Sequence, residues 1–390
     1  MQDLVRRISE RKYRFDMRVV FWSDLFWPFI GGSEIFAAKL LMALRERHEF
    51  VVVTRQDSPD LPAEDSYDGI SVYRLPFCTA MASGDLKQLI RLRQQVAGLK
   101  RNFAPDLIHI HNFGPSILFH HETADAPSAP MLFTVQLEIS PYKKAGPDTL
   151  LERTLRAADW VNCVSSETLA QVRQRVPETI QRSSVVFNAL HVPSLLPRAL
   201  PLEPPRLLCL GRLQRQKGFD LALSALAEII DRFPSARLII AGDGPERGSL
   251  ERQVADLHLT GAVDFIGWVS PDEVPALINS AMMVIIPSRY EGLPLIGLEA
   301  ALMARPIVAS RISGLSEIVL HEKTGFLVEP EDTAGLTEAI VFLLTHPRQA
   351  AQMGQAGRCR TQELFSWEQC VEDYNDLYRK LANQPSCGEE

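Results

Sequence analysis

Two carboxylates lie within the stretch PSRYEGLPLIGLEA (287–300), Glu291 and Glu299, with seven residues between them. An apolar, β-rich run at 282–286 precedes this stretch and a helical pattern follows, so we expect Glu291 in the turn and Glu299 about one turn inside the helix. Carboxylates accept strong hydrogen bonds from hydroxyls, so one could hold a sugar ring and the other a ribose. The alternative is a helix whose first turn carries Glu only to complement the helix dipole.

The backbone between the two glutamates is predicted to form an anion site. The amides of Gly292, Leu293 and Leu295 would point outward at a helix N-terminus, where unpaired donors and the dipole favour negative charge. The carboxylates would repel an anion, so they suit neutral hydroxyls while the amides suit a diphosphate.

A second loop, GRLQRQKG (211–218), follows a β-rich run at 206–210 and precedes a helical pattern. Its glycines, beginning with Gly211, admit a close backbone approach, and Arg212 and Lys217 supply positive charge. Their type and place are those of diphosphate ligands. A solvated basic loop is the alternative, because exposed Arg and Lys are common.

The elements that must position these loops form two series. Short β-rich runs alternate with longer helical patterns, and nearly continuous apolar strands separated by helices indicate parallel sheets covered on both faces. The first series has predicted strands at 18–22, 50–54, 107–110, 131–135 and 160–164. The second has them at 206–210, 237–241, 263–266, 282–286, 306–309 and 325–328. Ligands usually bind at the carboxyl ends of such strands, in a cleft between domains.

The predicted organisation has four parts. Five prolines within 191–206 interrupt the alternation of strands and helices and mark a domain boundary. We therefore expect an N-terminal extension (1–15), two α/β domains (16–195 and 196–365) and a C-terminal helix with a tail (366–390). In the second domain, Ser270, Pro271 and Glu273 predict a capping box that opens a helix.

Composition excludes several classes of protein. Apolar residues make up 46% and charged residues 23%, which are globular proportions, and the net charge of -7 argues against a general attraction to nucleic acid. Six scattered cysteines form no cluster with metal-ligand spacing and are expected to be free thiols.

The start of the sequence lacks the apolar stretch of a secretory signal, and no window reaches the length of a membrane span, so a cytoplasmic location is expected. The segment 4–14 is either a solvated extension, which the usual disorder of chain ends favours, or a basic amphipathic helix in peripheral contact with the cytoplasmic face of a membrane.

In combination these motifs resemble the retaining glycosyltransferases of family 4, which share the GT-B architecture of two Rossmann-like domains facing across a cleft. The resemblance runs from about residue 18 to 381 and includes AGDGP (241–245) and FIG (265–267). It implies that the first domain serves the acceptor and the second the nucleotide-sugar donor.

The resemblance also implies individual roles. Arg212 and Lys217 would grip the donor diphosphate, Glu299 the ribose and Glu291 the transferred sugar. The backbone around Ile266 would meet the base. Gly31 and Gly32 would approach the donor from the first domain. The C-terminal helix would return to that domain.

The resemblance further implies that no cofactor or metal takes part, and the chain has no D-x-D motif, which fits. The donor would be a co-substrate, with a UDP-sugar weakly favoured. Cations and backbone donors, instead of a metal ion, would stabilise the leaving diphosphate. The expected acceptor is a hydroxyl of a glycan, a lipid-linked glycan or a small metabolite.

One position departs from the family pattern. Similar enzymes usually place a histidine after the strand at 131–135, and this chain has Gln136, which can donate a hydrogen bond to a sugar hydroxyl but cannot take a proton. Strand alternation puts His109 and His111 on one face, so His111 either reaches the cleft from the strand tip or is structural.

The departure keeps rival functions open. A catalytically silent donor-binding protein or partner subunit would keep Arg212, Lys217 and Glu299 while lacking the chemistry. A related epimerase or phosphorylase is a third possibility, against which the pair of glutamates argues. Near Gly31, the loop aromatics Phe26, Trp27 and Phe29 could stack on an acceptor sugar or touch lipid.

Overall fold

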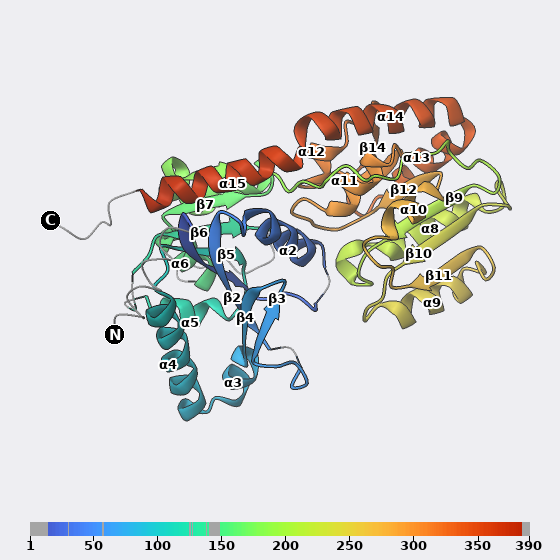
Figure 1. Ribbon diagram of the computed structural model, residues 1–390. Coiled ribbons are helices and arrows are strands. Elements are labelled where there is room, and N and C mark those ends of the chain that lie inside the picture. Colours follow the sequence, from blue (N-terminus) through green and yellow to red (C-terminus); the bar gives the residue numbers. More distant parts are fainter. Residues whose placement is uncertain are drawn as a thin grey trace. The chain divides into compact units, whose positions relative to one another are not determined.

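A computed structural model describes residues 15–29, 31–56, 58–124, 126, 128–137, 139 and 149–383. The segment 4–14, for which two interpretations were open, lies outside the described residues. The chain divides into two compact units (Figure 1). The first contains residues 1–164, 168–186 and 368–390, and the second contains 165–167 and 187–367.

The first unit is built on an eight-stranded sheet with the order β3-β4-β2-β1-β5-β6-β7-β8. Every strand pair is parallel except β3 with β4, which form an antiparallel edge hairpin. The strands are β1 (Met17–Ser23), β2 (His48–Arg55), β3 (Glu64–Tyr67), β4 (Ile70–Leu75), β5 (Leu107–Asn112), β6 (Met131–Val135), β7 (Trp160–Cys163) and β8 (Ser183–Val185). The central strands are buried almost throughout, as their apolar runs predict.

Helices cover this sheet and include the last helix of the chain. They are α2 (Gly32–Leu44), α3 (Phe77–Ser83), α4 (Leu86–Phe103), α5 (Ile117–His121), α6 (Leu150–Ala157), α7 (Ser166–Arg175), η1 (Pro177–Arg182) and α15 (Trp367–Ala382). Helix α15 is bonded to the sheet through buried side chains: the hydroxyl of Tyr378 lies 2.7 Å from Nδ1 of His109, and Asn162 donates to Tyr374. The C-terminal helix is therefore part of the first unit's core.

The second unit is a six-stranded, fully parallel sheet with the order β11-β10-β9-β12-β13-β14. Its strands are β9 (Arg206–Leu210), β10 (Arg237–Ala241), β11 (Val263–Gly267), β12 (Met283–Ile286), β13 (Ile307–Ser310) and β14 (Gly325–Val328). The helices are η2 (Arg215–Lys217), α8 (Phe219–Ile229), α9 (Arg247–Asp256), α10 (Val274–Asn279), α11 (Leu295–Leu302), α12 (Leu315–Ile318), α13 (Thr333–Thr345) and α14 (Pro347–Leu364). Helix α8 packs against α9 and α13, and α11 packs against α10 and α14.

The prediction of two α/β domains with parallel sheets is confirmed, and the strands of the second unit begin and end within one residue of the predicted bounds. The predicted start of the helix after Ser270 is wrong. Ser270 does bond to Glu273 through its amide and hydroxyl, but the bonds close a turn and α10 begins only at Val274. Ser270 donates both bonds to the Glu273 carboxylate, so the full capping box does not form and the pair is compatible with a non-helical turn.

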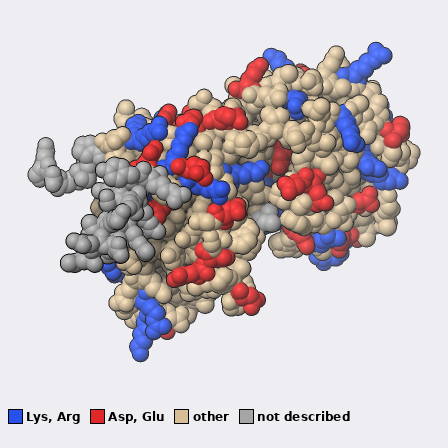
Figure 2. Space-filling view, viewed as in Figure 1, with Lys and Arg blue, Asp and Glu red and all other residues tan. Residues whose placement is uncertain are grey.

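Charged side chains of both signs are interspersed over the face shown in Figure 2, in keeping with the net charge of -7. Within the described residues, no helix has both the length and the apolar character needed to cross a bilayer. Cys78, Cys163, Cys209, Cys359 and Cys370 are all free thiols, as their spacing predicted.

Candidate functional site

The two loops singled out in the sequence lie side by side in the second unit. Loop 211–218 follows β9 and loop 287–294 follows β12, and β9 and β12 are hydrogen-bonded neighbours in the sheet. The chain continues from β9 to β10 on one side and reaches β12 on the other, so the strand order reverses between them. Such a switch point, at the carboxyl ends of parallel strands, is where open α/β sheets bind ligands.

Glycines allow the backbones at this edge to touch. A Cβ at Gly218 would lie 2.0 Å from the carbonyl oxygen of Pro287, and the φ of Gly218 is +65°. Similarly, a Cβ at Gly314 would lie 1.9 Å from the carbonyl oxygen of Gly292, with φ at +73°. Both positions need a left-handed backbone and leave no room for a side chain. The separation of loops 211–218 and 287–294 is therefore set by backbone contact.

Arg289 bonds the two loops together. Its guanidinium donates to both carboxylate oxygens of Asp220, at 2.8 and 2.7 Å, and to the carbonyl of Arg215, while its amide donates to the carbonyl of Gln216 at 2.7 Å. Burial alone would raise the pKa of Asp220, but hydrogen bonding and charge from Arg289 outweigh it and lower that pKa. A bidentate Arg–carboxylate pair fixes orientation as well as distance.

Two of the four charged residues expected to hold the donor, Lys217 and Glu291, are in contact across the two loops. Nζ of Lys217 lies 2.6 Å from Oε1 of Glu291, which also accepts from the hydroxyl of Ser288 at 2.8 Å. Glu291 is 4% exposed, and Nε2 of Gln216 approaches its other oxygen at 3.4 Å. Hydrogen bonds from three side chains fix the orientation of this buried carboxylate. The sequence did not predict that Lys217 and Glu291 would bind each other.

Other residues expected to bind the donor lie on the same two loops and on α11. Helix α11 opens after Pro294 without a side-chain cap, so its first amides are not satisfied by a capping group. The three residues expected to supply amides, Gly292, Leu293 and Leu295, are all buried at this end. Glu299 is half-buried on α11, and Arg212 is half-buried directly after Gly211, at the end of β9.

The edge strand β11 ends beside an exposed apolar surface. Ile266, the expected contact for the base, is 46% exposed, and Trp268 just beyond the strand is 57% exposed. Trp268 was not singled out in the sequence, although an aromatic residue following a strand end could have drawn attention to it. An exposed indole at a carboxyl strand end offers a stacking surface for a planar base.

In the first unit, the paired glycines open α2. Gly31 is its N-cap residue, with extended backbone and no side-chain cap, and Gly32 is its first residue. Asn112, at the end of the adjacent β5, donates to Glu34 of this helix at 3.3 Å. The expected approach of Gly31 and Gly32 to a donor stays a prediction.

His111 and Gln136 are in contact at the ends of β5 and β6. Their Nε2 atoms lie 3.1 Å apart, and Gln136 is 7% exposed. His111 has no exposed surface and its ring stacks on those of Phe21 and Phe36. Burial and ring stacking favour the structural interpretation of His111. The alternative, that it reaches the cleft from the strand tip, stays a prediction.

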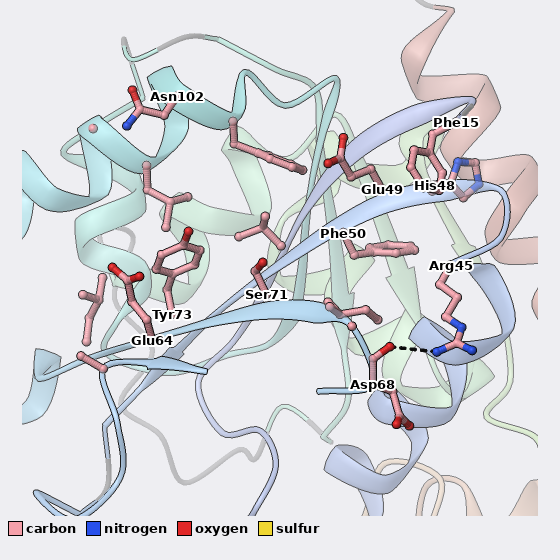
Figure 3. Close-up of a pocket in the computed structure, with 18 of the residues that line it drawn as sticks. Phe15, Arg45, His48, Glu49, Phe50, Glu64, Asp68, Ser71, Tyr73 and Asn102 are labelled. Atoms are coloured by element: carbon pink, nitrogen blue, oxygen red, sulfur yellow. Dashed lines mark hydrogen bonds between the residues drawn. The ribbon is translucent and has the colours of Figure 1, made fainter. Parts of the chain in front are cut away.

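A groove of about 790 Å³ lies elsewhere in the first unit (Figure 3). Its lining includes Arg45, which donates to the carbonyl of Asp68, and His48 and Glu49 at the start of β2. His48 and Glu49 begin β2, so this part of the groove lies at the amino end of that strand, and none of the residues expected to bind the donor lines the groove.

Family models match almost the whole described chain. "Glycosyltransferase Family 4" matches residues 30–192, and "Glycosyl transferases group 1" matches residues 197–360. The chain belongs to glycosyltransferase family 4. The two matches divide this glycosyltransferase between β8 and β9, in the proline-rich segment of the sequence.

Curated relatives of this glycosyltransferase include sugar-transferring enzymes. It is 29% identical to a glycogen synthase of Mycobacterium tuberculosis over 71% of its own chain and 69% of the relative. It is also 37% identical to a GDP-mannose-dependent alpha-(1-6)-phosphatidylinositol monomannoside mannosyltransferase of Mycolicibacterium smegmatis, over 42% of its own chain and 45% of the relative.

Among solved structures, sucrose-phosphate synthase from Thermosynechococcus elongatus is similar with a TM-score of 0.79 and 24% identity, covering 93% of this glycosyltransferase and 99% of the other chain. The likeness shows the GT-B fold, as the sequence resemblance predicted.

The close approach of loops 211–218 and 287–294 can be tested by adding a methyl group. Gly218→Ala should destabilise the protein by about 3 kcal/mol or more, because its Cβ would overlap the carbonyl of Pro287 on a strained backbone. Gly248→Ala is the matched control: it lies in α9 with nothing within 4 Å and should be neutral or slightly stabilising. Thermal unfolding of both variants compares them; equal melting temperatures would contradict the backbone contact.

Burial of His111 predicts a pH dependence of stability. Burial lowers its pKa to about 3, against a smaller opposing effect from the backbone of Ser33, so the unfolded chain binds a proton below about pH 6.5 and the folded chain does not. This contribution is fully present above pH 6.5 and is lost as the pH falls toward 3. Lowering the pH from 7.5 to 5.5 should therefore reduce the free energy of unfolding by about 1 kcal/mol through His111.

Urea unfolding at these two pH values measures the effect. His111→Gln should show a smaller loss of unfolding free energy on acidification than the wild type, whatever its stability at pH 7.5. The control His258→Gln removes an exposed histidine and should keep the wild-type dependence. Identical dependence in the wild type and His111→Gln would contradict the prediction.

Proposed function

We propose that this glycosyltransferase moves a sugar from a nucleotide-diphosphate sugar to an acceptor hydroxyl, with retention at the anomeric carbon and without a metal ion. The observation that carries the proposal is the joining of loops 211–218 and 287–294 at the switch point of the second sheet. Lys217 and Glu291 meet there, beside the uncapped start of α11. Cationic groups and backbone amides bind a diphosphate, and carboxylates accept hydrogen bonds from the hydroxyls of a sugar ring joined to it.

In this proposal the donor's parts are divided among these groups. Arg212, Lys217 and the first amides of α11 bind the diphosphate, while Glu291 accepts hydrogen bonds from the transferred sugar and Glu299 from the ribose. Ile266 and Trp268 receive the base. The diphosphate binds Lys217, whose positive charge Glu291 balances in the structure.

Transfer then breaks the bond between the anomeric carbon and the diphosphate oxygen and forms one to the acceptor oxygen on the same face. The acceptor proton passes to the leaving diphosphate, so no protein base is required. Lys217, Arg212 and the amides stabilise the charge that develops on the diphosphate, as preorganised donors do in a dry site. The substitution of Gln136 for histidine is compatible with this route, because an amide can orient a hydroxyl without taking its proton.

Donor base and acceptor stay open within this proposal. The sequence weakly favours a UDP-sugar, while the mycobacterial relative is GDP-mannose-dependent, so both bases belong in the assay. A glycan, lipid-linked glycan or small-molecule hydroxyl acceptor fits the family equally well. A silent donor-binding protein is the rival, favoured only by the amide at position 136, which is held against His111.

Calorimetric titration with UDP, GDP and ADP tests the donor site. One nucleotide should bind with micromolar affinity, and Arg212→Ala and Glu299→Ala should each weaken it about tenfold or more, because each removes a charged hydrogen-bonding group. Arg252→Ala and Glu338→Ala, which alter exposed residues on α9 and α13, are the matched controls and should bind normally. Absence of binding by all three nucleotides would refute the donor site.

The variant Gln136→His distinguishes the two hypotheses, an active transferase and a catalytically silent donor-binding protein. If the wild type transfers sugar from its preferred donor, the substitution should change the rate only modestly. A rise from no detectable transfer to clear turnover would show that the natural chain is silent.

A further inference from the structure

We infer that Trp27 forms a stacking platform for a sugar ring of the acceptor, in the first unit and separate from the donor site; this rests on the proposed transferase function. The loop after β1 carries three aromatic residues, and the structure distinguishes them. Phe26 is 4% exposed and belongs to the core, Phe29 is half-buried, and Trp27 is 40% exposed. Only Trp27 offers a large open ring.

The loop that carries Trp27 is held at two points by arginines. The guanidinium of Arg55 lies 3.2 Å from the carboxylate of Asp24, which is 6% exposed and also accepts a hydrogen bond from the amide of Ser116. In the middle of the loop, Arg74 donates to the carbonyl of Trp27 at 2.9 Å. An exposed aromatic on a loop held in this way loses little conformational entropy on binding.

Arg74 also supports the indole itself. Its guanidinium lies 5.7 Å from the centroid of the Trp27 ring, it is 1% exposed, and it pairs with Asp65 of β3 at 2.8 Å. The ring of Tyr67 packs against Trp27 at a centroid distance of 5.7 Å. Burying an arginine carries a large desolvation cost, which hydrophobic packing would avoid. Unlike hydrophobic packing, Arg74 also holds the exposed indole of Trp27 in a fixed position.

The location suits an acceptor. The loop leaves the carboxyl end of β1, a central strand of the first sheet, and leads to Gly31 and α2. Ligands of parallel sheets bind at this edge. The C–H bonds on one face of a pyranose form an apolar patch that packs on an indole, and the surrounding hydroxyls need acceptors.

Charge around the platform favours a sugar over a lipid surface. The hairpin that packs against Trp27 carries Glu64, Asp65 and Asp68, of which Glu64 and Asp68 are exposed. These carboxylates would be repelled by anionic headgroups, whereas membrane-binding surfaces are typically basic. Carboxylates also accept hydrogen bonds from sugar hydroxyls. We therefore assign the platform to a carbohydrate.

The test uses the full chain saturated with the nucleotide that it binds. Methyl glucoside, methyl mannoside, methyl galactoside and maltotriose serve as probes, and tryptophan fluorescence and calorimetry report their binding. Trp27→Ala should weaken binding of at least one saccharide about tenfold, because the stacking surface is lost, and Trp27→Phe should weaken it less. The fluorescence change should disappear in Trp27→Phe.

Trp160→Phe is the matched control. Trp160 is a half-buried tryptophan at the start of β7, bonded to Ser184, and its replacement should leave saccharide binding unchanged. Nucleotide affinity should be the same in every variant, which separates failure of the platform from failure of the proposed function.

The platform is overturned if no saccharide binds or if Trp27→Ala binds as tightly as the wild type. It is equally overturned if Trp27→Ala instead abolishes sedimentation with phosphatidylcholine–phosphatidylglycerol vesicles.

Discussion

The contact on which the proposed donor site depends is between two stretches of backbone, where Gly218 faces the carbonyl of Pro287. Neighbouring parallel strands bring the two loops to the same edge, but only a residue without a side chain lets them meet. Once they meet, Arg289 reaches both Asp220 and the carbonyl of Arg215 and holds the loops in register. This contact sets the distance between Lys217 and Glu291, so side chains 74 residues apart in the sequence lie together.

The site so formed holds opposite charges in balance. Lys217 and Glu291 neutralise each other, and the hydroxyl of Ser288 completes the bonding of the carboxylate. A buried charge without a partner would be costly, so the pair allows a strongly polar site to exist before any ligand arrives. A ligand that presents a diphosphate to the lysine and hydroxyls to the glutamate satisfies both members together. In the proposed donor site, a lone anion or a lone sugar would satisfy only one member of the pair.

The sequence predicted the elements of the site better than their contacts. The strands before the two loops were placed within a residue because apolar β-rich runs in parallel sheets are nearly continuous. The edge hairpin β3–β4 was missed, since a strand with exposed acidic residues such as Glu64 lacks that signal. The bond between Lys217 and Glu291 could not be predicted either, because it depends on the order of strands in the sheet. The Ser270–Glu273 pair shows that a correct local interaction can still misplace a helix.

In the first unit, the sequence likewise predicted the position of His111 but not its contacts. Alternation correctly placed His109 and His111 on one face, with ring centroids 5.5 Å apart, but it could not show that α15 and the aromatic residues would bury them. Burial keeps His111 neutral, so its Nε2 can accept a hydrogen bond from the amide nitrogen of Gln136. One of the two amide hydrogens of Gln136 is therefore used in this buried hydrogen bond. Protonation of His111 would remove that acceptor, so the orientation of Gln136 depends on the burial of its neighbour.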